Sequence, residues 1–195
     1  MKLNKAAILF FMGAIGMLNL FGCSEGPKYG QYSSRDPELG VTMQYPKDWS
    51  YSEARGANGS YAQVVFIEPK KKDKPVLAQI VLTVRHESKA GVKPPTQEAM
   101  KEDLLKKRLK FKDALVLSQS ISEISGIKCD VLEFSYSLRK ELYSLDGALV
   151  PIREKVIIFK NGEKFYIFRY RNTKQDFEKF NKAFVNCAGT LRFKI

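Results

Sequence analysis

The larger part of the chain is a succession of short segments rich in β-branched and aromatic residues, separated by short turns. In the first of them, Val41, Met43 and Tyr45 alternate with polar residues, which indicates a strand with one buried face. Near the other end of the chain Asn161-Gly162 joins two such segments, and Asn-Gly is typical of a hairpin turn. Because connections this short can join only antiparallel neighbours, the sequence predicts a mostly antiparallel sheet rather than a doubly wound parallel one.

We expect strands at residues 41–45, 49–51, 61–68, 76–87, 115–122, 127–138, 149–159 and 164–171. The third and fourth of these form a hairpin across a lysine-rich turn. Residues 56–60 are rich in glycine and serine, but no Gly-Lys-Ser or Gly-Lys-Thr follows them. We therefore interpret them as a hairpin loop and not as a phosphate-binding loop.

Two further segments have the spacing of helices. The first is capped by Thr96 and extends to about Phe111. In the second, Thr173 and Asp176 resemble a capping box. Side chains expected to be buried are Met100, Leu104 and Phe111 on the first helix and Phe177, Phe180, Phe184, Cys187 and Leu191 on the second. Aromatic residues at this spacing usually pack against a sheet, so the sequence predicts helices packed on an antiparallel sheet, an α+β fold.

The first residues of the chain have the three parts of an export signal. Lys2 and Lys5 precede an apolar stretch at residues 6–18, and a small residue, Gly22, stands before Cys23. The apolar stretch is shorter than the roughly 20 residues that a membrane-spanning helix needs. We therefore predict that residues 1–22 are a signal peptide and that the mature chain lies outside the cytoplasm.

The position of Cys23 directly after Gly22 resembles the lipobox of bacterial lipoproteins. That resemblance implies that Cys23 carries a diacylglycerol and a further acyl chain such as palmitate, and two or more chains give stable anchoring. Ser24 favours the outer membrane over the inner one. The expected location is the cell membrane or the outer membrane, facing the periplasm or the cell exterior. An ordinary cleaved signal, or an uncleaved anchor, would leave the domain on the same side.

Residues 23–39 contain glycine, serine, proline and charged residues without apolar periodicity. We interpret them as the lipidated cysteine followed by a flexible tether, and we place the globular domain at residues 40–195. About 15 tether residues would span on the order of 50 Å when extended. A tether of that length would let the domain stand off the membrane or fold back onto it.

The chain is basic, with a net charge of +12. Two clusters form a possible basic surface: Lys70, Lys71, Lys72 and Lys74 in the lysine-rich turn, and Lys106, Lys107, Arg108 and Lys110 on the first helix. An exported protein rarely meets nucleic acid, so we expect no nucleic-acid partner; anionic lipid headgroups or cell-wall polymers fit better. The alternative is that both clusters only keep the protein soluble.

Two stretches of the chain resemble PsbP-like domains. Residues 40–49, with a Tyr-Pro step and a tryptophan, resemble the opening of these domains. The aromatic strand at 165–170, the helix at 176–184 and the sequence at 190–193 resemble their end. The chain is thus similar to bacterial lipoproteins of the DcrB type, to a Ran-binding protein and to the extrinsic photosystem II protein PsbP.

The resemblance implies an α/β sandwich built around an antiparallel sheet, and it implies binding or assembly rather than catalysis. In PsbP, histidines and acids are proposed as metal contacts. This chain has one histidine, His86, so the resemblance transfers no metal site.

The residues themselves predict no catalytic site, metal or cofactor. A metal site needs several His, Cys or carboxylate ligands at set spacings, and His86 with Glu87 is too few. A Ser-His-Asp site would need the same histidine, and no Gly-x-Ser-x-Gly motif accompanies it. Glu102 and Asp103 are spaced to pair with Lys106 and Lys107 along one helix. We therefore expect that the protein is not an enzyme.

Cys129 and Cys187 remain once Cys23 is assigned to the lipid. They could form a disulfide between a strand and the second helix, since an extracytoplasmic compartment permits one. The alternative is two separate buried thiols, because a bridge needs Cα atoms within about 7 Å.

Two functions remain open. The first is a non-catalytic binding or assembly module for an unknown envelope protein or anionic polymer, which exposed Tyr136, Tyr143 or Tyr170 around a groove would support. The second is a small-ligand or ion receptor subunit associated with a transporter or enzyme. A concave pocket with converging polar groups would favour that second function.

Overall fold

The computed structural model describes residues 28–56, 59–70, 76–86, 95–139 and 147–194. Within them the chain forms, in order, β1 (Tyr29–Ser33), β2 (Val41–Pro46), β3 (Ser50–Arg55), β4 (Tyr61–Ile67), β5 (Gln79–His86), α1 (Gln97–Arg108), β6 (Lys112–Ile124), β7 (Ile127–Arg139), β8 (Leu149–Asn161), β9 (Lys164–Thr173), α2 (Phe177–Gly189) and β10 (Arg192–Phe193). No helix among these residues is long and apolar enough to cross a membrane.

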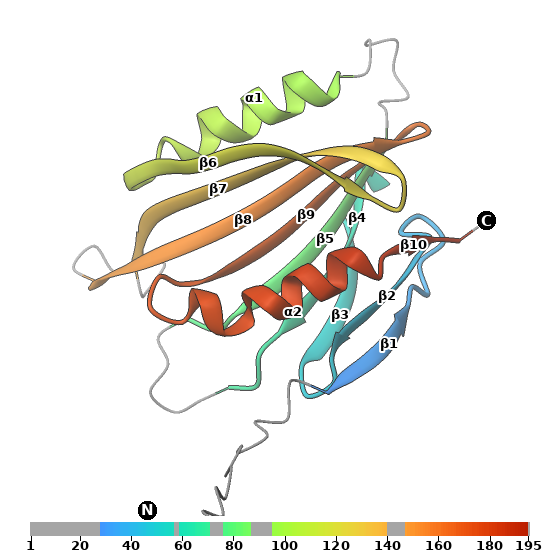
Figure 1. Cartoon of the computed structure of the whole chain (residues 1–195), viewed down its shortest axis with the longest axis horizontal. Coiled ribbons are helices and arrows are strands. Elements are labelled where there is room, and N and C mark those ends of the chain that lie inside the picture. Colours follow the sequence, from blue (N-terminus) through green and yellow to red (C-terminus); the bar gives the residue numbers. More distant parts are fainter. Residues whose placement is uncertain (1–27, 57–58, 71–75, 87–94, 140–146, 195) are drawn as a thin grey trace, which may run out of the picture.

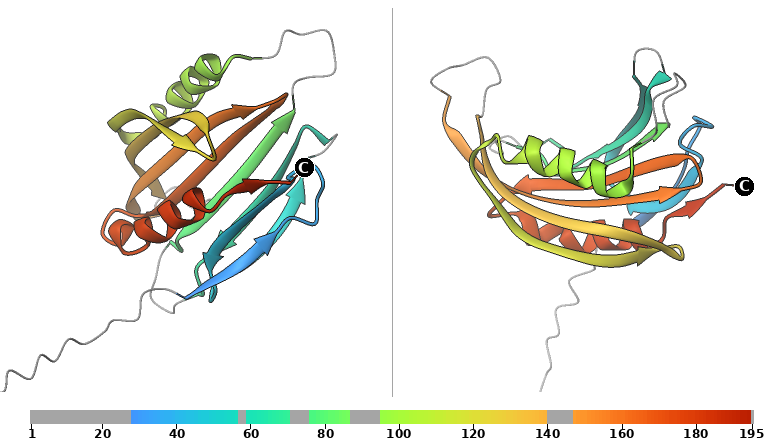
Figure 2. Two further views of the ribbon diagram at one scale, coloured as in Figure 1. Left: turned by 45° about the vertical axis from the view of Figure 1, so that its right-hand side comes forward. Right: turned by 90° about the horizontal axis from the view of Figure 1, so that it is seen from above.

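The strands form two antiparallel sheets. The larger has the order β3-β4-β5-β9-β8-β7-β6, and the smaller has the order β1-β2-β10. Helix α1 lies over β7 and β8 on the concave side of the larger sheet, whereas α2 packs between β9 and the smaller sheet on the opposite face (Figures 1 and 2). The layers are therefore helix, sheet, and helix with small sheet, as expected for a PsbP-like α+β fold.

Alternation along the central strands divides the core in two. On β8, Ile157 and Phe159 belong to the larger apolar cluster on the α2 side, while Ile152, Val156 and Ile158 belong to a smaller cluster beneath α1. The strands therefore bury both faces. The Asn161-Gly162 turn is a hairpin as predicted, and Gly162 has φ 60°, a value that glycine adopts without strain.

Helix α1 begins as expected but ends earlier. The Thr96 Oγ1 accepts a hydrogen bond of 3.1 Å from the Ala99 N–H, which caps the helix. Met100 and Leu104 are buried, but the helix ends at Arg108. Phe111 is 38% exposed and stacks on Tyr136, so its predicted place on a buried helical stripe is wrong.

Helix α2 confirms the predicted apolar stripe except at Phe180, which is only partly buried. Phe177, Phe184 and Cys187 are buried, and Leu191 is buried just beyond the helix end. Asp176 is the N-cap residue, but its side chain makes no cap hydrogen bond. The Oγ1 of Thr173 instead accepts a hydrogen bond of 3.2 Å from the Asp176 N–H, so the pair is not a reciprocal capping box.

The predicted tether at residues 23–39 and the domain start at residue 40 need correction. Residues 29–33 form β1, which pairs along its whole length with β2. Tyr32 and Leu39 are almost fully buried. Residues 29–39 belong to the fold because β1 pairs with the edge of β2. The polar residues of β1 lie at exposed positions, so its sequence lacks the apolar pattern that a strand usually has.

The possible disulfide is not formed. Cys129 on β7 and Cys187 on α2 are both free and both buried in the larger apolar cluster. Burial raises the pKa of the Cys187 thiol to about 12 and also raises that of Cys129. Both thiols therefore stay protonated and unreactive at neutral pH.

Candidate functional site

Helix α1 rests on the sheet through few apolar side chains and is held by polar contacts at both ends. Near its start, the Gln97 Nε2 donates a 2.7 Å hydrogen bond to Asp130 Oδ2, and the Lys101 Nζ lies 3.5 Å from Asp130 Oδ1. At its end, Arg108 pairs with Glu154 of β8. The helix contacts β7 and β8, and space remains beside it, between α1 and the neighbouring strands β5 and β9.

A cavity of about 440 Å³ fills that space. Its walls come from α1, from β5 and β9, and from single residues just before β4 and α1. The lining residues are Ser60, Thr83, Arg85, Pro95, Ala99, Met100, Asp103, Leu104, Lys107, Arg108, Phe165, Ile167 and Arg169. We call this cavity the α1 pocket. It combines an apolar floor with four basic side chains, which is the composition of a site for a ligand that is both apolar and anionic.

One buried carboxylate organises the arginines. Glu154 is fully buried and accepts hydrogen bonds from the Nε and Nη2 of Arg108, the latter at 3.2 Å. The Nε of Arg169 lies 3.5 Å from Glu154 Oε1. Burial acts to lower the pKa of Arg108, but the attraction and hydrogen bonds of Glu154 raise it overall. Arg108 therefore stays charged and fixes the end of α1.

Arg169 is less well compensated. Burial lowers the pKa of its guanidinium, and the positive charges of Arg108 and Arg171 act in the same direction. Glu154 and, more weakly, Tyr136 act to raise it but do not outweigh the lowering. The Arg171 Nη2 donates a 2.8 Å hydrogen bond to Gln79 Oε1, while its buried Nε has no hydrogen-bond partner among the described residues. Three arginines thus surround one carboxylate, and the site holds an excess of positive charge.

The rim of the α1 pocket adds to this excess. Lys107 is neutralised by Asp103, whose Oδ2 lies 2.6 Å from the Lys107 Nζ. Arg85 comes from the end of β5, and no carboxylate of the described residues pairs with it. Arg85 and Arg169 are therefore the two side chains that can donate hydrogen bonds to an anion in the pocket.

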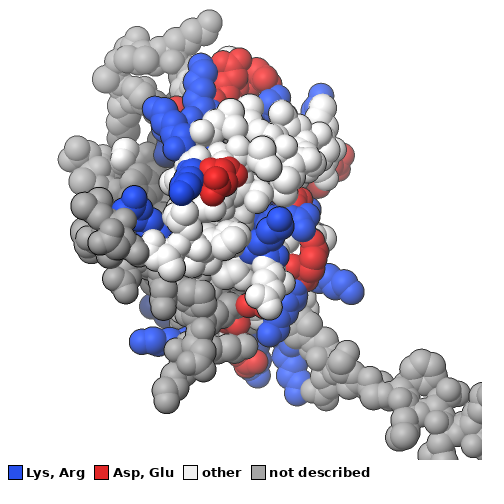
Figure 3. Space-filling model, turned by 90° about the vertical axis from the view of Figure 1, so that its left-hand side faces the viewer, with Lys and Arg blue, Asp and Glu red and all other residues white. Residues whose placement is uncertain are grey.

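The predicted basic surface is not a continuous one. Lys70 and Lys110 are exposed, and Lys71, Lys72 and Lys74 lie outside the described residues. Lys106 lies 3.9 Å from Glu102, as the helical spacing predicted. The assignment of Arg108 to this surface is wrong, because its side chain is mostly buried and forms an ion pair with buried Glu154. On the face in Figure 3, basic and acidic side chains adjoin one another around a broad uncharged area.

The aromatic residues expected around a groove do not lie there. Tyr136 and Tyr170 are both buried, and Tyr143 lies outside the described residues. The Tyr170 hydroxyl donates a 2.7 Å hydrogen bond to the Phe177 carbonyl, which ties β9 to α2. Burial raises the pKa of Tyr136 to about 12. These tyrosines serve the core and not a binding surface.

Cys23, the predicted lipidation site, lies outside the described residues. His86 is the last residue of β5, and the described part of the chain contains no group of three His, Cys, Asp or Glu residues that could hold a metal ion.

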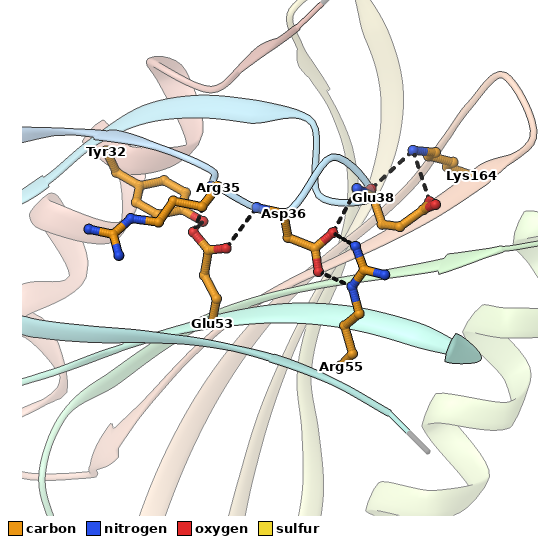
Figure 4. A network of polar contacts seen from close by, with 7 residues as sticks. All are labelled: Tyr32, Arg35, Asp36, Glu38, Glu53, Arg55 and Lys164. Atoms are coloured by element: carbon orange, nitrogen blue, oxygen red, sulfur yellow. Dashed lines mark hydrogen bonds and ion pairs between the residues drawn. The ribbon is translucent and has the colours of Figure 1, made fainter. Parts of the chain in front are cut away.

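A second polar cluster ties the loop after β1 to the larger sheet (Figure 4). Glu53 on β3 accepts hydrogen bonds from the Tyr32 hydroxyl at 2.8 Å and from the Asp36 N–H at 2.9 Å. Asp36 in turn pairs with Arg55 at 2.5 and 2.6 Å, and the Lys164 Nζ lies 3.5 Å from Glu38. The Arg55 hydrogen bond lowers the pKa of Asp36. Because these carboxylates are occupied by the chain itself, we regard the cluster as structural.

Sequence reasoning missed Arg85, Arg169 and Glu154. A signal was present in β9, where Phe165, Ile167, Arg169 and Arg171 share one face of a strand whose other face is aromatic. Arginines on the face of a central strand need a partner or a ligand.

The comparisons with known proteins concern the fold. No family model matches the sequence, and no curated protein matches it. Among solved structures, the cyanobacterial PsbP protein CyanoP from Synechocystis is similar at 14% identity, with a TM-score of 0.55 over 91% of this chain and 99% of that chain. LpqN, involved in cell envelope biogenesis of Mycobacterium tuberculosis, is similar at 13% identity and a TM-score of 0.50 over 86% and 91% of the two chains.

The Ran-binding protein Mog1p of Saccharomyces cerevisiae is similar at 8% identity, with a TM-score of 0.53 over 86% of this chain and 96% of that chain. Identities this low compare folds and not activities. With two helices packed on a mostly antiparallel sheet, the chain has the PsbP-like fold that its sequence resembles.

Proposed function

We propose that this protein is a non-catalytic binding module of the cell envelope whose α1 pocket takes an anionic ligand with an aliphatic part. The observation that carries the proposal is that one cavity combines an apolar floor with Arg85, which no described carboxylate pairs with, and Arg169, which shares the single carboxylate of Glu154 with Arg108. This is the small-ligand alternative of the sequence analysis. Exposed tyrosines around a groove would have supported the alternative, assembly with an envelope protein or polymer. Tyr136 and Tyr170 are buried and do not give that support.

The chemistry of the lining defines the ligand class. Guanidinium groups bind carboxylate and phosphate through paired hydrogen bonds, and such charge-assisted bonds are about twice as strong as neutral ones. The same cavity also has an aliphatic and aromatic surface, formed by Met100, Leu104, Phe165 and Ile167. A headgroup bearing one phosphate or carboxylate, attached to a short alkyl chain, matches both parts of the lining.

The location is part of the same proposal. We assign residues 1–22 to a signal peptide and Cys23 to lipid attachment, so that the module stays at the membrane without spanning it. The similarity in fold to LpqN, whose described involvement is in cell envelope biogenesis, supports an envelope location.

A titration with octyl phosphate tests the pocket. The chain from residue 24 onward is titrated in a calorimeter with octyl phosphate below its micelle concentration, and with octanol as the uncharged counterpart. We expect octyl phosphate to bind and octanol to bind at least tenfold more weakly. Arg85→Gln and Arg169→Gln should each weaken octyl phosphate binding about tenfold, since a hydrogen bond to a charged group contributes about 1.5–3 kcal/mol.

Arg35→Gln is the matched control, because Arg35 is an exposed arginine in the loop after β1, away from the α1 pocket (Figure 4). It should leave the dissociation constant unchanged. Equal affinity for octanol and octyl phosphate, or equal losses in the three arginine variants, would contradict the proposal.

A second function, assembly with an envelope protein, is favoured by the outer edge of the larger sheet. The edge strand β6 exposes Leu115 and Ile121 by more than 60%. Two register shifts interrupt its pairing with β7, and such bulges disfavour the addition of another strand, so a partner would contact the exposed side chains of β6 and not its backbone. Crosslinking in native membranes followed by pull-down tests this function. The assembly function requires that the pull-down recovers one specific partner and that the Leu115→Lys variant no longer recovers it.

A further inference from the structure

The tether between Cys23 and the folded domain is shorter than the sequence predicted. The described fold begins with Lys28 and β1, so only residues 24–27 separate the fold from Cys23. Covalent geometry limits a stretch of about five residues to roughly 17 Å, even when it is fully extended. A lipid on Cys23 would therefore hold the point where β1 begins close to the membrane surface.

That point lies at one end of the molecule. The Lys47 N–H donates a 2.8 Å hydrogen bond to the Lys28 carbonyl, so the chain enters the fold beside the turn between β2 and β3. Trp49 follows in the same turn and packs edge-on against Phe180 of α2. In Figure 1 and in the left view of Figure 2 this end lies below the sheets, on the side away from α1. We call it the tether end.

Basic side chains are exposed at the tether end. Lys28 and Lys47 flank the point of entry, and Lys70 follows the end of β4, whose Ile67 pairs with Ser50 at the start of β3. Lys179 lies over the Phe180 ring. Asp48 is the exposed acid in the turn itself. Each basic residue near an anionic bilayer contributes about 1 kcal/mol, so this end is suited to lie against anionic lipid.

The α1 pocket extends along the same strands to their other end, from Arg169, which pairs with Val81, to Arg85. At the tether end, Gln79 of β5 pairs with Ile67 and Arg171. At the pocket, Arg85 of β5 pairs with Tyr61 and Phe165. The six residue-to-residue steps from Gln79 to Arg85 span about 20 Å at 3.4 Å per step. The strands therefore act as a spacer of fixed length between the two ends.

We propose that the lipid-anchored protein stands on its tether end against an anionic lipid surface and presents the Arg85 end of the α1 pocket about 20 Å further out, toward the aqueous side. This inference rests on the lipid anchor of the proposed function, but not on what the pocket binds. A long tether, as the sequence suggested, would allow many orientations; a short one attached beside the β2–β3 turn allows few.

The single tryptophan of the chain makes the orientation measurable. The lipidated protein, purified from membranes, is reconstituted on vesicles of phosphatidylethanolamine and phosphatidylglycerol that carry a dansyl lipid. Energy transfer from Trp49 to the dansyl groups should be efficient. A double variant, Trp49→Phe with Tyr61→Trp, moves the donor to the pocket end while keeping an aromatic residue at both sites, and its transfer should be several-fold weaker.

A second variant leaves the fold untouched. A Gly-Ser insert of about 20 residues after Ser24 adds roughly 25 Å of root-mean-square reach and should lower the transfer from Trp49. Equal transfer from residues 49 and 61, or transfer from Trp49 that the insert does not change, overturns the orientation.

Failure of the parent protein to float with the vesicles would overturn the anchor and this inference together. The octyl phosphate titration uses the chain without its lipid, so its outcome still decides the function of the pocket. A positive titration with failed flotation would thus separate the two proposals.

Discussion

Helices α1 and α2 lie on opposite faces of one sheet but are held there differently. Helix α2 buries Phe177, Ala183, Phe184, Cys187 and Ala188 and closes the larger apolar cluster. Helix α1 buries Met100 and Leu104, and its ends are held by Asp130 and Glu154. The same sheet therefore has a closely packed apolar core on its α2 face and a cavity on its α1 face. Helix α2 fills its face of the sheet with apolar side chains, whereas α1 buries only two and leaves a cavity beside it, over β5 and β9.

The largest expected effect lies under α2. Phe184→Ala removes a ring whose centroid lies 5.0 Å from that of Phe168, and it leaves a cavity in the larger cluster. We expect the free energy of unfolding to fall by about 3–5 kcal/mol. Urea denaturation followed by circular dichroism measures it. Val185→Ala, one residue along and 55% exposed, is the control and should stay within about 0.5 kcal/mol.

A smaller loss of stability, joined to a gain in binding, is expected under α1. Glu154→Gln removes the carboxylate that Arg108 and Arg169 share. Breaking a buried pair from one side costs about 3 kcal/mol. The same change frees two guanidinium groups, so octyl phosphate should bind more tightly to this variant than to the parent protein.

Glu133→Gln is the matched control on the α2 face, where Glu133 pairs with Arg153. It should destabilise the protein and leave the affinity for octyl phosphate unchanged. If both variants change the affinity equally, the α1 pocket is not the anion site.

Acid should loosen the layer that α2 and the small sheet share. The pKa of Asp36 is lowered by the Arg55 hydrogen bond; that of Glu53 is also lowered, since its hydrogen bonds from Arg35, Tyr32 and Asp36 outweigh burial, which acts to raise it. The unfolded chain then takes up protons at higher pH than the folded chain does. This stabilisation is complete above the unfolded pKa of about 4 and is lost as pH falls through the folded value.

Urea midpoints measured between neutral pH and about pH 3 test this expectation. The double variant Asp36→Asn with Glu53→Gln should be less stable at neutral pH and should lose less stability on acidification. Parallel pH profiles for the parent and the variant would show that these two carboxyls do not cause the loss.

The smallest expected effect lies at the start of α1. Thr96→Ala removes the side chain that caps the Ala99 N–H, which costs about 1 kcal/mol. Glu102→Ala on the exposed side of the same helix breaks only a surface pair of 3.9 Å and should cost about 0.5 kcal/mol or less. If the two losses in unfolding free energy are equal, the capping hydrogen bond does not stabilise the helix.

Local patterns in the sequence were sufficient for most of the fold. Alternation and turn residues predicted the antiparallel strands, and the stripe from Phe177 to Leu191 predicted the helix that fills the core. Strand β1 was missed because its alternation buries little more than Tyr32, which is too weak a signal to separate a strand from a linker.

The α1 pocket could not be predicted in the same way. Its basic residues come from α1, β5 and β9, and only the order of strands in the sheet brings Arg85 next to Phe165. The charge of Arg108 suggested an exposed surface, since its partner Glu154 is 46 residues away along the chain. The periodicity of apolar residues predicts individual strands and helices, but it does not predict which distant strands pair in the sheet.

The place of β2 between the first and last strands has a consequence for the timing of folding. Its Val41 pairs with Phe193 of β10, and α2 comes just before β10 in the chain. The small sheet cannot gain its third strand, nor the larger cluster its helix, until α2 and β10 have left the ribosome. A chain so arranged stays incompletely folded until α2 and β10 have been made, although most strands of the larger sheet are complete before then.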